Sequence, residues 1–156
     1  LHVDSFPSTP MQGRRTLRFF ANVNPHGRTR TWRIGEPFEA LAQRYARSIP
    51  SPMPGASLAL DLLGITKSRR SDYDHYMLRL HDKMKADAAY QSTVTQQLYE
   101  FPSGCTWLCF TDQVSHAAMG GQYALEQTFY LPVDAMSDPA RSPLRVLERV
   151  IGRPLV

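Results

Sequence analysis

Residues 105–131 read CTWLCFTDQVSHAAMGGQYALEQTFYL, and their pattern decides the fold. The mostly apolar segment CTWLCFTD (105–112) follows the turn PSG and predicts a strand. The segment YALEQTFYLPV (123–133) predicts a second strand. The small residues between them indicate a turn, and His116 lies in it. The order strand, turn, histidine, strand is therefore expected here.

The rest of the chain supplies further strands and several helices. Further strands are predicted at 1–6 and 16–24, where residues alternate between two faces, and at 31–35 and 96–102. Helical periodicity predicts helices at 36–49, 58–65, 71–92 and 142–152. Ser71 and Asp74 suit a capping box at the start of the longest helix. Antiparallel-type strands with inserted helices, and no parallel βαβ alternation, predict an α+β fold built on a β core.

Length and composition favour one globular domain that includes all of residues 1–156. The chain is 42% hydrophobic and 21% charged, and this hydrophobic fraction is enough to form a core in 156 residues. No apolar run approaches the ~20 residues that cross a bilayer. The net charge of +4 suggests an anionic partner such as a nucleic acid, an acidic lipid surface or a metabolite. Since no basic DNA-reading helix or aromatic RNA-binding sheet is visible, we expect no nucleic-acid partner.

The start of the chain and the spacing of the two cysteines each lead to a further prediction. LHVDSF reads like a strand already under way, so we expect a fragment of a longer protein. Cys105 and Cys109 would lie roughly 13 Å apart on one face of a strand, at ~3.3 Å per residue. That is too far for a disulfide, so two free thiols in a reducing compartment are expected.

A candidate metal site begins at His2 and Asp4, whose spacing of two places both side chains on one face of a strand. A facial triad for non-haem iron(II) needs a second histidine and open positions for substrate and oxygen. His26 lies in a turn, and His75 and His81 lie on the predicted long helix. His116 follows a strong strand and leads into another, which is the layout that a jelly-roll iron site requires.

Five segments together resemble the Kdo hydroxylase family, whose members act on 3-deoxy-D-manno-oct-2-ulosonic acid (Kdo). They are HVDSF, GRRTLRFFANVNP, WRIGEPFE, TKSRRSDYDHYMLRLHDKMK and FPSGCTWLCFTDQVSHAAMGGQYALEQTFYLP. The resemblance covers nearly the whole chain but only the carboxyl-terminal portion of such an enzyme. It implies a double-stranded β-helix (a jelly-roll, cupin-like core) with inserted helices, incomplete at its N-terminus because upstream strands are missing. A fragment of this kind can be inactive.

The resemblance also implies the chemistry. Iron(II) would be held by His2, Asp4 and His116, and 2-oxoglutarate and O2 would be consumed as a Kdo residue of a lipid A precursor is hydroxylated at carbon 3. It implies a cytoplasmic enzyme that can associate peripherally with the inner face of the bacterial inner membrane. Two alternatives stay open at this point. One is a non-catalytic cupin-like module that binds metal or sugar, and the other is a peripheral lipid- or phosphate-binding domain.

The co-substrate anchor departs from a common pattern. Many 2-oxoglutarate enzymes carry a basic residue about ten positions after the distal histidine, but Glu126 and Gln127 stand there. A carboxylate still needs a cation, preferably a bidentate one. Arg18 is the best substitute unless it faces solvent, with Asn22 and Thr128 as further hydrogen-bond donors.

Basic and aromatic residues complete the candidate set. Lys67, Arg69 and Arg70 precede the long helix and could hold the Kdo carboxylate or lipid A phosphates, or form a solvated basic loop. Trp32 and Trp107 are expected in the core rather than as sugar platforms.

Overall fold

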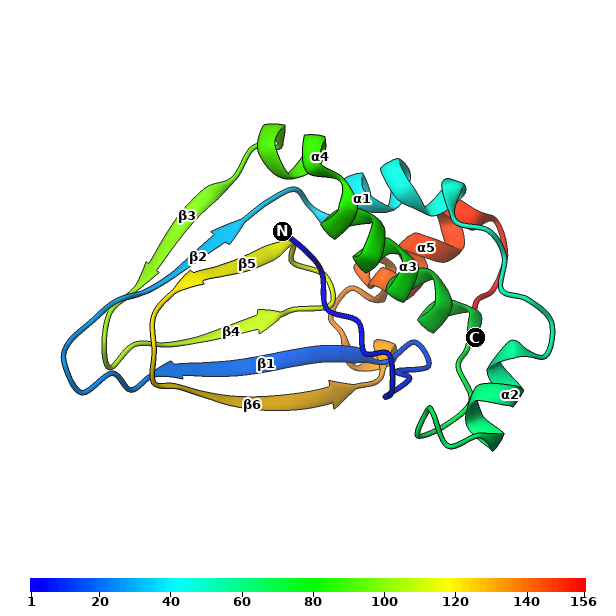
Figure 1. Ribbon diagram of the computed structural model, residues 1–156, viewed down its shortest axis with the longest axis horizontal. Coiled ribbons are helices and arrows are strands. Elements are labelled where there is room, and N and C mark those ends of the chain that lie inside the picture. The colour runs from blue at the N-terminus through cyan, green and yellow to red at the C-terminus, as the bar shows by residue number, and fades with distance from the viewer.

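The computed structural model describes all 156 residues and contains two three-stranded antiparallel sheets (Figure 1). The first sheet has the order β4-β1-β6, and the second has the order β3-β2-β5. Their strands are β1 (Arg15–Asn22), β2 (Arg30–Ile34), β3 (Gln97–Phe101), β4 (Thr106–Phe110), β5 (His116–Gly120) and β6 (Ala124–Leu131). The chain therefore changes sheet between β1 and β2, between β3 and β4, and at each later strand.

The helices lie beside one end of the two sheets, with α2 farther out than the others (Figure 1). They are α1 (Phe38–Tyr45), η1 (Ala46–Ser48), α2 (Ala56–Leu62), α3 (Asp72–Ala86), α4 (Ala88–Thr93), η2 (Val133–Ala135), η3 (Pro139–Arg141) and α5 (Pro143–Ile151). None of them is long and apolar enough to cross a bilayer. The predicted α+β class with antiparallel strands is confirmed, whereas the jelly-roll topology remains a prediction.

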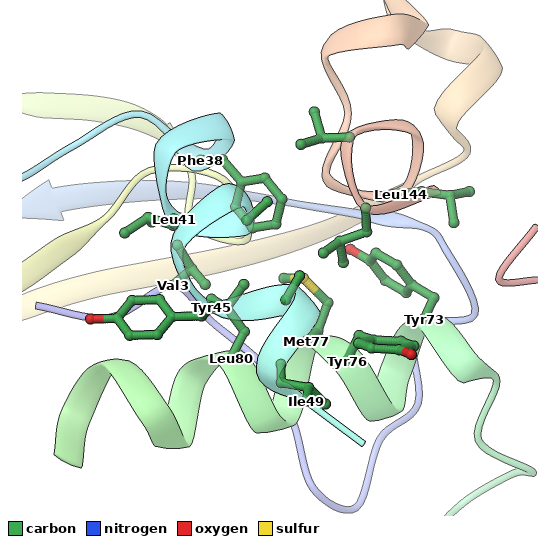
Figure 2. Packing of buried hydrophobic residues seen from close by; sticks show 14 of the residues in the cluster. Val3, Phe38, Leu41, Tyr45, Ile49, Tyr73, Tyr76, Met77, Leu80 and Leu144 are labelled. Carbon is green, nitrogen blue, oxygen red and sulfur yellow. The ribbon is translucent and has the colours of Figure 1, made fainter. Parts of the chain in front are cut away.

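We expected the main hydrophobic core to lie within the β structure. It lies instead among the helices. Nineteen buried apolar residues form one cluster, drawn mostly from α1, α3 and α5. Figure 2 shows Phe38 and Leu41 of α1 facing Tyr73, Met77 and Leu80 of α3. Val3 joins this cluster, so the segment that carries His2 and Asp4 is fixed from one side by helical packing.

An aromatic cluster fills the space between the two sheets. Trp107 stacks on Phe101 with ring centroids 3.9 Å apart, and it also stacks on Phe20 at 5.2 Å. Trp32 meets Phe20 edge to face at 4.9 Å and is almost fully buried. The expectation that Trp32 belongs to the core is confirmed, and these contacts hold the inner faces of the sheets together.

Three predicted boundaries were wrong. Residues 1–6 do not form a regular strand, because only His2 makes a β-bridge and Pro7 follows soon after. The predicted turn at His116 is the start of β5, whose small residues have low β-propensity and depend on pairing with β2. The predicted helix 71–92 divides at Asp87, whose side chain accepts a hydrogen bond from Tyr90 N and caps α4. The capping box at Ser71 is confirmed.

A buried ion pair fastens the start of β1 to the end of β4. Arg15 is fully buried and binds Asp112 through both Nε (2.7 Å) and an Nη atom (3.1 Å). Its guanidinium lies over the Phe110 ring and also donates to Gln113. Burial raises the pKa of Asp112 even though Arg15 lowers it. Burying two charges is costly, so removal of either Arg15 or Asp112 would leave the other as an unpaired buried charge.

Candidate metal site

Two histidines from distant parts of the sequence are direct cross-strand neighbours. His2 N donates to His116 O at 3.0 Å, and His116 N donates to His2 O at 2.9 Å. This reciprocal pair places both side chains on the same face of the sheet. The opening segment thus extends the β3-β2-β5 sheet beyond β5 by a single bridge.

Asp4 completes a three-residue group. Its backbone N donates to Thr111 O at 2.7 Å, which anchors the segment to the end of β4. Asp4 Oδ1 lies 3.4 Å from His2 Nε2 and 3.9 Å from His116 Nε2. The three ligand atoms all lie within 4.8 Å of one another. Closure by about an ångström would let them share one ion at the ~2 Å bonds that such ligands make.

The ring orientations are set by hydrogen bonds outside the group. His116 Nδ1 lies 2.8 Å from Val114 O, and since a carbonyl only accepts, Nδ1 carries the proton. His116 Nε2 is then free to donate its lone pair toward Asp4 and a metal. His81 of α3 binds Val3 O in the same way at 2.8 Å, which holds the backbone between His2 and Asp4.

Electrostatics favour the protonation states that a metal needs. Burial alone would raise the pKa of Asp4, but its hydrogen bond with His2 and the charges of His116 and Arg18 lower it overall. Burial lowers the pKa of the His116 imidazole, although Val114 O and Asp4 oppose this. At neutral pH the group therefore offers one carboxylate and a neutral His116 ring.

Two neighbours of the group were not foreseen as parts of it. Trp32 stacks on His116 with ring centroids 5.1 Å apart, and its buried indole N–H has no hydrogen-bond partner. Cys109 is a free thiol, as expected for both cysteines. Burial, with the charges of Asp4 and Asp112, raises the pKa of Cys109 to about 12, so it stays protonated and does not act as a thiolate ligand.

The other predicted histidines are not ligands in this geometry. The ring of His81 is 5.2 Å from that of His2, slightly farther than the 4.8 Å that separates His2 from His116. His75 binds Pro50 O, and His26 contacts Tyr123 in the turn after β1. The predicted convergence of His2, Asp4 and His116 is confirmed, and their role as metal ligands remains a proposal.

Arg18 of β1 lies beside the group but is already paired. One Nη atom lies 3.2 Å from Asp4 Oδ2, and the other lies 3.0 Å from Glu126 Oε1. Its guanidinium also lies over the Phe6 ring. Thr128 of β6 is the cross-strand partner of Arg18. The guanidinium is therefore half-buried beside the candidate ligands, where Glu126 neutralises part of its charge.

The remaining predicted residues do not reach the group. Asn22 is buried, and its amide donates to Arg28 O and Phe101 O, each at 2.9 Å. It fastens the turn after β1, roughly 13 Å along the strand from Arg18 at ~3.3 Å per residue. None of the three basic residues before α3 bonds to His2, Asp4 or His116; they lie against the loop 7–12. The basic residues are Lys67, Arg69 and Arg70.

Two imidazoles and one carboxylate on antiparallel β structure are the set of side chains that mononuclear non-haem iron(II) oxygenases use as metal ligands. The sequence profile of the 3-deoxy-D-manno-oct-2-ulosonic acid (Kdo) hydroxylase family matches residues 1–154. The chain therefore belongs to the Kdo hydroxylase family. No curated protein matches it.

Solved structures of the Kdo hydroxylase KdoO, described as a non-heme Fe(II) alphaketoglutarate dependent dioxygenase, are similar to this chain. They include the apo protein, a complex with alphaketoglutarate and Fe(III), and a complex with succinate and Fe(III). Each is 52% identical over 100% of this chain, with a TM-score of 0.98. The chain spans only 53% of the KdoO chain.

Proposed function

We propose that the chain forms the metal-binding part of an iron(II)- and 2-oxoglutarate-dependent hydroxylase of Kdo sugars. The substrate would be a Kdo residue of a lipid A precursor, hydroxylated at carbon 3. The observation that carries this proposal is the convergence of His2 Nε2, Asp4 Oδ1 and His116 Nε2 in a member of the Kdo hydroxylase family. One of the similar KdoO structures is a complex with alphaketoglutarate and Fe(III).

The donor set fits the proposed metal. Two imidazoles and a carboxylate suit iron(II) and leave coordination positions open for other ligands. His2, Asp4 and His116 would hold the ion, and Val114 O would keep the His116 ring in the productive tautomer. Bound iron would supply the activation of O2, coupled to decarboxylation of 2-oxoglutarate to succinate. Burial of the site by Trp32 and Phe6 would limit access of water.

We further propose that the two sheets belong to a double-stranded β-helix. The support is the way the chain changes sheet at β2, β4, β5 and β6. Residues 1–156 would be part of a single dioxygenase domain, in keeping with the greater length of KdoO. We place this enzyme in the cytoplasm, where Kdo-containing lipid A precursors would be its substrate.

The proposal is tested by supplying Fe(II), 2-oxoglutarate, O2 and a Kdo-containing lipid A precursor to the chain and to a KdoO-length protein that contains it. The expected products are succinate and a lipid one oxygen atom heavier, in equal amounts, detected by mass spectrometry. Metal binding by the longer protein without consumption of 2-oxoglutarate would instead indicate a non-catalytic metal- or sugar-binding β module.

Arg18 is the proposed cation for the far carboxylate of 2-oxoglutarate. In the KdoO-length protein, Arg18→Met should lower the apparent affinity for 2-oxoglutarate by about tenfold to a hundredfold, because one or two charge-assisted hydrogen bonds are lost. The matched variant Glu126→Gln should keep or raise this affinity, because it releases the guanidinium from its present partner. Titration of 2-oxoglutarate at saturating metal measures both effects. Equal affinities in all three proteins would place the anchor on another residue.

A further inference from the structure

A cluster of exposed apolar side chains projects from the molecule around α2. Met53, Leu62 and Leu63 are 76%, 78% and 73% exposed, and Leu58 and Ile65 are exposed beside them. We name these five residues the apolar tip. No residue of α2 is buried, and Figure 1 shows this helix standing apart from the sheets and from the other helices. Water-facing clusters of this kind mark surfaces that bind a partner.

The apolar tip is a folded structure. Leu58 and Leu62 are four residues apart on α2 and therefore share a face. Leu63 N donates to Ala59 O at 3.0 Å, and Ile65 N donates to Leu60 O at 3.0 Å. Gly64 adopts φ +67°, which lets the chain reverse directly after the helix. The leucines are thus presented outward by a closed, hydrogen-bonded helix end.

Basic residues follow the tip immediately. Lys67, Arg69 and Arg70 form what we name the basic flank, and Asp61 is the one acidic residue between Met53 and Arg70. The Lys67 and Arg69 side chains are exposed, and neither forms an ion pair. Protruding leucines beside unpaired cations fit a surface whose outer layer is anionic and whose deeper layer is apolar. A bilayer of acidic lipids has that structure.

The basic flank is tied to the metal site through one loop. Lys67 N donates to Ser8 O at 2.9 Å, Gln12 Nε2 donates to Arg69 O at 3.1 Å, and the Arg70 guanidinium binds Pro7 O. This loop begins three residues after Asp4. A surface that held the tip would therefore lie next to the segment that carries His2 and Asp4.

We propose that the apolar tip and basic flank dock the protein on the surface of a bilayer that contains anionic lipids. The leucines would enter the boundary between headgroups and acyl chains, and Lys67 and Arg69 would contact the headgroup phosphates. The choice of a bilayer rests on the proposed function, because a lipid A precursor is presented by a membrane. Docking would occur in the membrane plane, since no helix can span it.

Co-sedimentation with lipid vesicles tests the docking without metal, co-substrate or sugar. We expect the chain to bind vesicles of phosphatidylcholine with about one-third phosphatidylglycerol, and to bind pure phosphatidylcholine at least about tenfold more weakly. Lys67→Gln/Arg69→Gln should weaken binding to the anionic vesicles by about twenty- to thirtyfold, since each cation near such a surface contributes a factor of about five. Leu62→Ser/Leu63→Ser should weaken it by at least about tenfold.

Matched variants elsewhere on the surface make the result specific. Leu108 and Leu125 are 61% and 63% exposed on the outer face of the β4-β1-β6 sheet, so Leu108→Ser/Leu125→Ser is the apolar control. Arg28→Gln/Arg47→Gln is the charge control, because both residues are exposed and lie outside the flank. Both controls should bind anionic vesicles as the parent chain does.

Three outcomes would overturn the docking proposal. They are no binding to anionic vesicles, equal loss in the apolar control, and a dimer in solution that Leu62→Ser/Leu63→Ser dissociates. Co(II) binding, followed separately by its visible absorption, reports the metal site in the same variants. Normal Co(II) binding without vesicle binding would contradict the docking proposal and leave the proposed function intact. Vesicle binding without Co(II) binding would contradict the proposed metal site and leave the docking proposal intact.

Discussion

Asp4→Ala should weaken Co(II) or Fe(II) binding by at least about a hundredfold. Asp4 is the only carboxylate in the group, and its Oδ1 lies within 4 Å of both histidine Nε2 atoms. Its loss removes one of three ligands together with the negative charge that offsets the ion, whereas changes to residues that merely support ligands cost about ten- to a hundredfold. Isothermal titration with Co(II) measures the effect.

A surface carboxylate provides the control for this variant. Asp134 is exposed and distant in sequence, so Asp134→Ala should bind Co(II) as the parent chain does. The thermal midpoint of the metal-free Asp4→Ala chain should be recorded as well, because Arg18 loses one of its two partners. Unchanged Co(II) affinity in a folded Asp4→Ala chain would exclude the proposed ligand set.

Asp112→Ala should lower the free energy of unfolding by about 3–5 kcal/mol. The substitution leaves the fully buried Arg15 guanidinium without its carboxylate partner, and an uncompensated buried charge costs that much. Contacts with Gln113 and the Phe110 ring would remain, but neither carries a negative charge. Urea denaturation followed by circular dichroism measures the change.

The double variant Arg15→Met/Asp112→Leu separates loss of the pair from burial of an unpaired charge. It removes both charges and keeps similar volume, so it should be more stable than Asp112→Ala. A single variant that loses less than about 1 kcal/mol would show that water reaches Arg15, contrary to its complete burial.

Local sequence patterns predicted the elements whose signals are local. The turn PSG followed by an apolar run identified the strand at 105–112, and the serine and aspartate of the capping box identified the start of α3. The pairing of His2 and Asp4 with His116 was also predictable, because spacing of two fixes one face of a strand and few histidines were available. The family resemblance supplied the sugar, which no residue pattern contains.

Other features depend on tertiary contacts that sequence reasoning does not see. β5 contains two alanines and one glycine and forms because β2 and His2 pair with it. His81 could not be linked to the site from sequence, because its relevance comes from a contact with Val3 O, far away in the chain. Trp32 was expected in the core, but its stacking on His116 depends on how the strands of one sheet align.

The bridge between His2 and His116 would make a bound metal ion a removable cross-link. It closes a loop that runs from residue 2 to residue 116, and the closure of so long a loop is entropically expensive. An ion bound at both ends would offset this cost by mass action, so the order of the opening segment should follow metal concentration. Without metal, hydrogen exchange at the His2 and Asp4 amides should be fast compared with that in α3. The catalytic centre of such a chain would be assembled last during folding, once the ion has arrived.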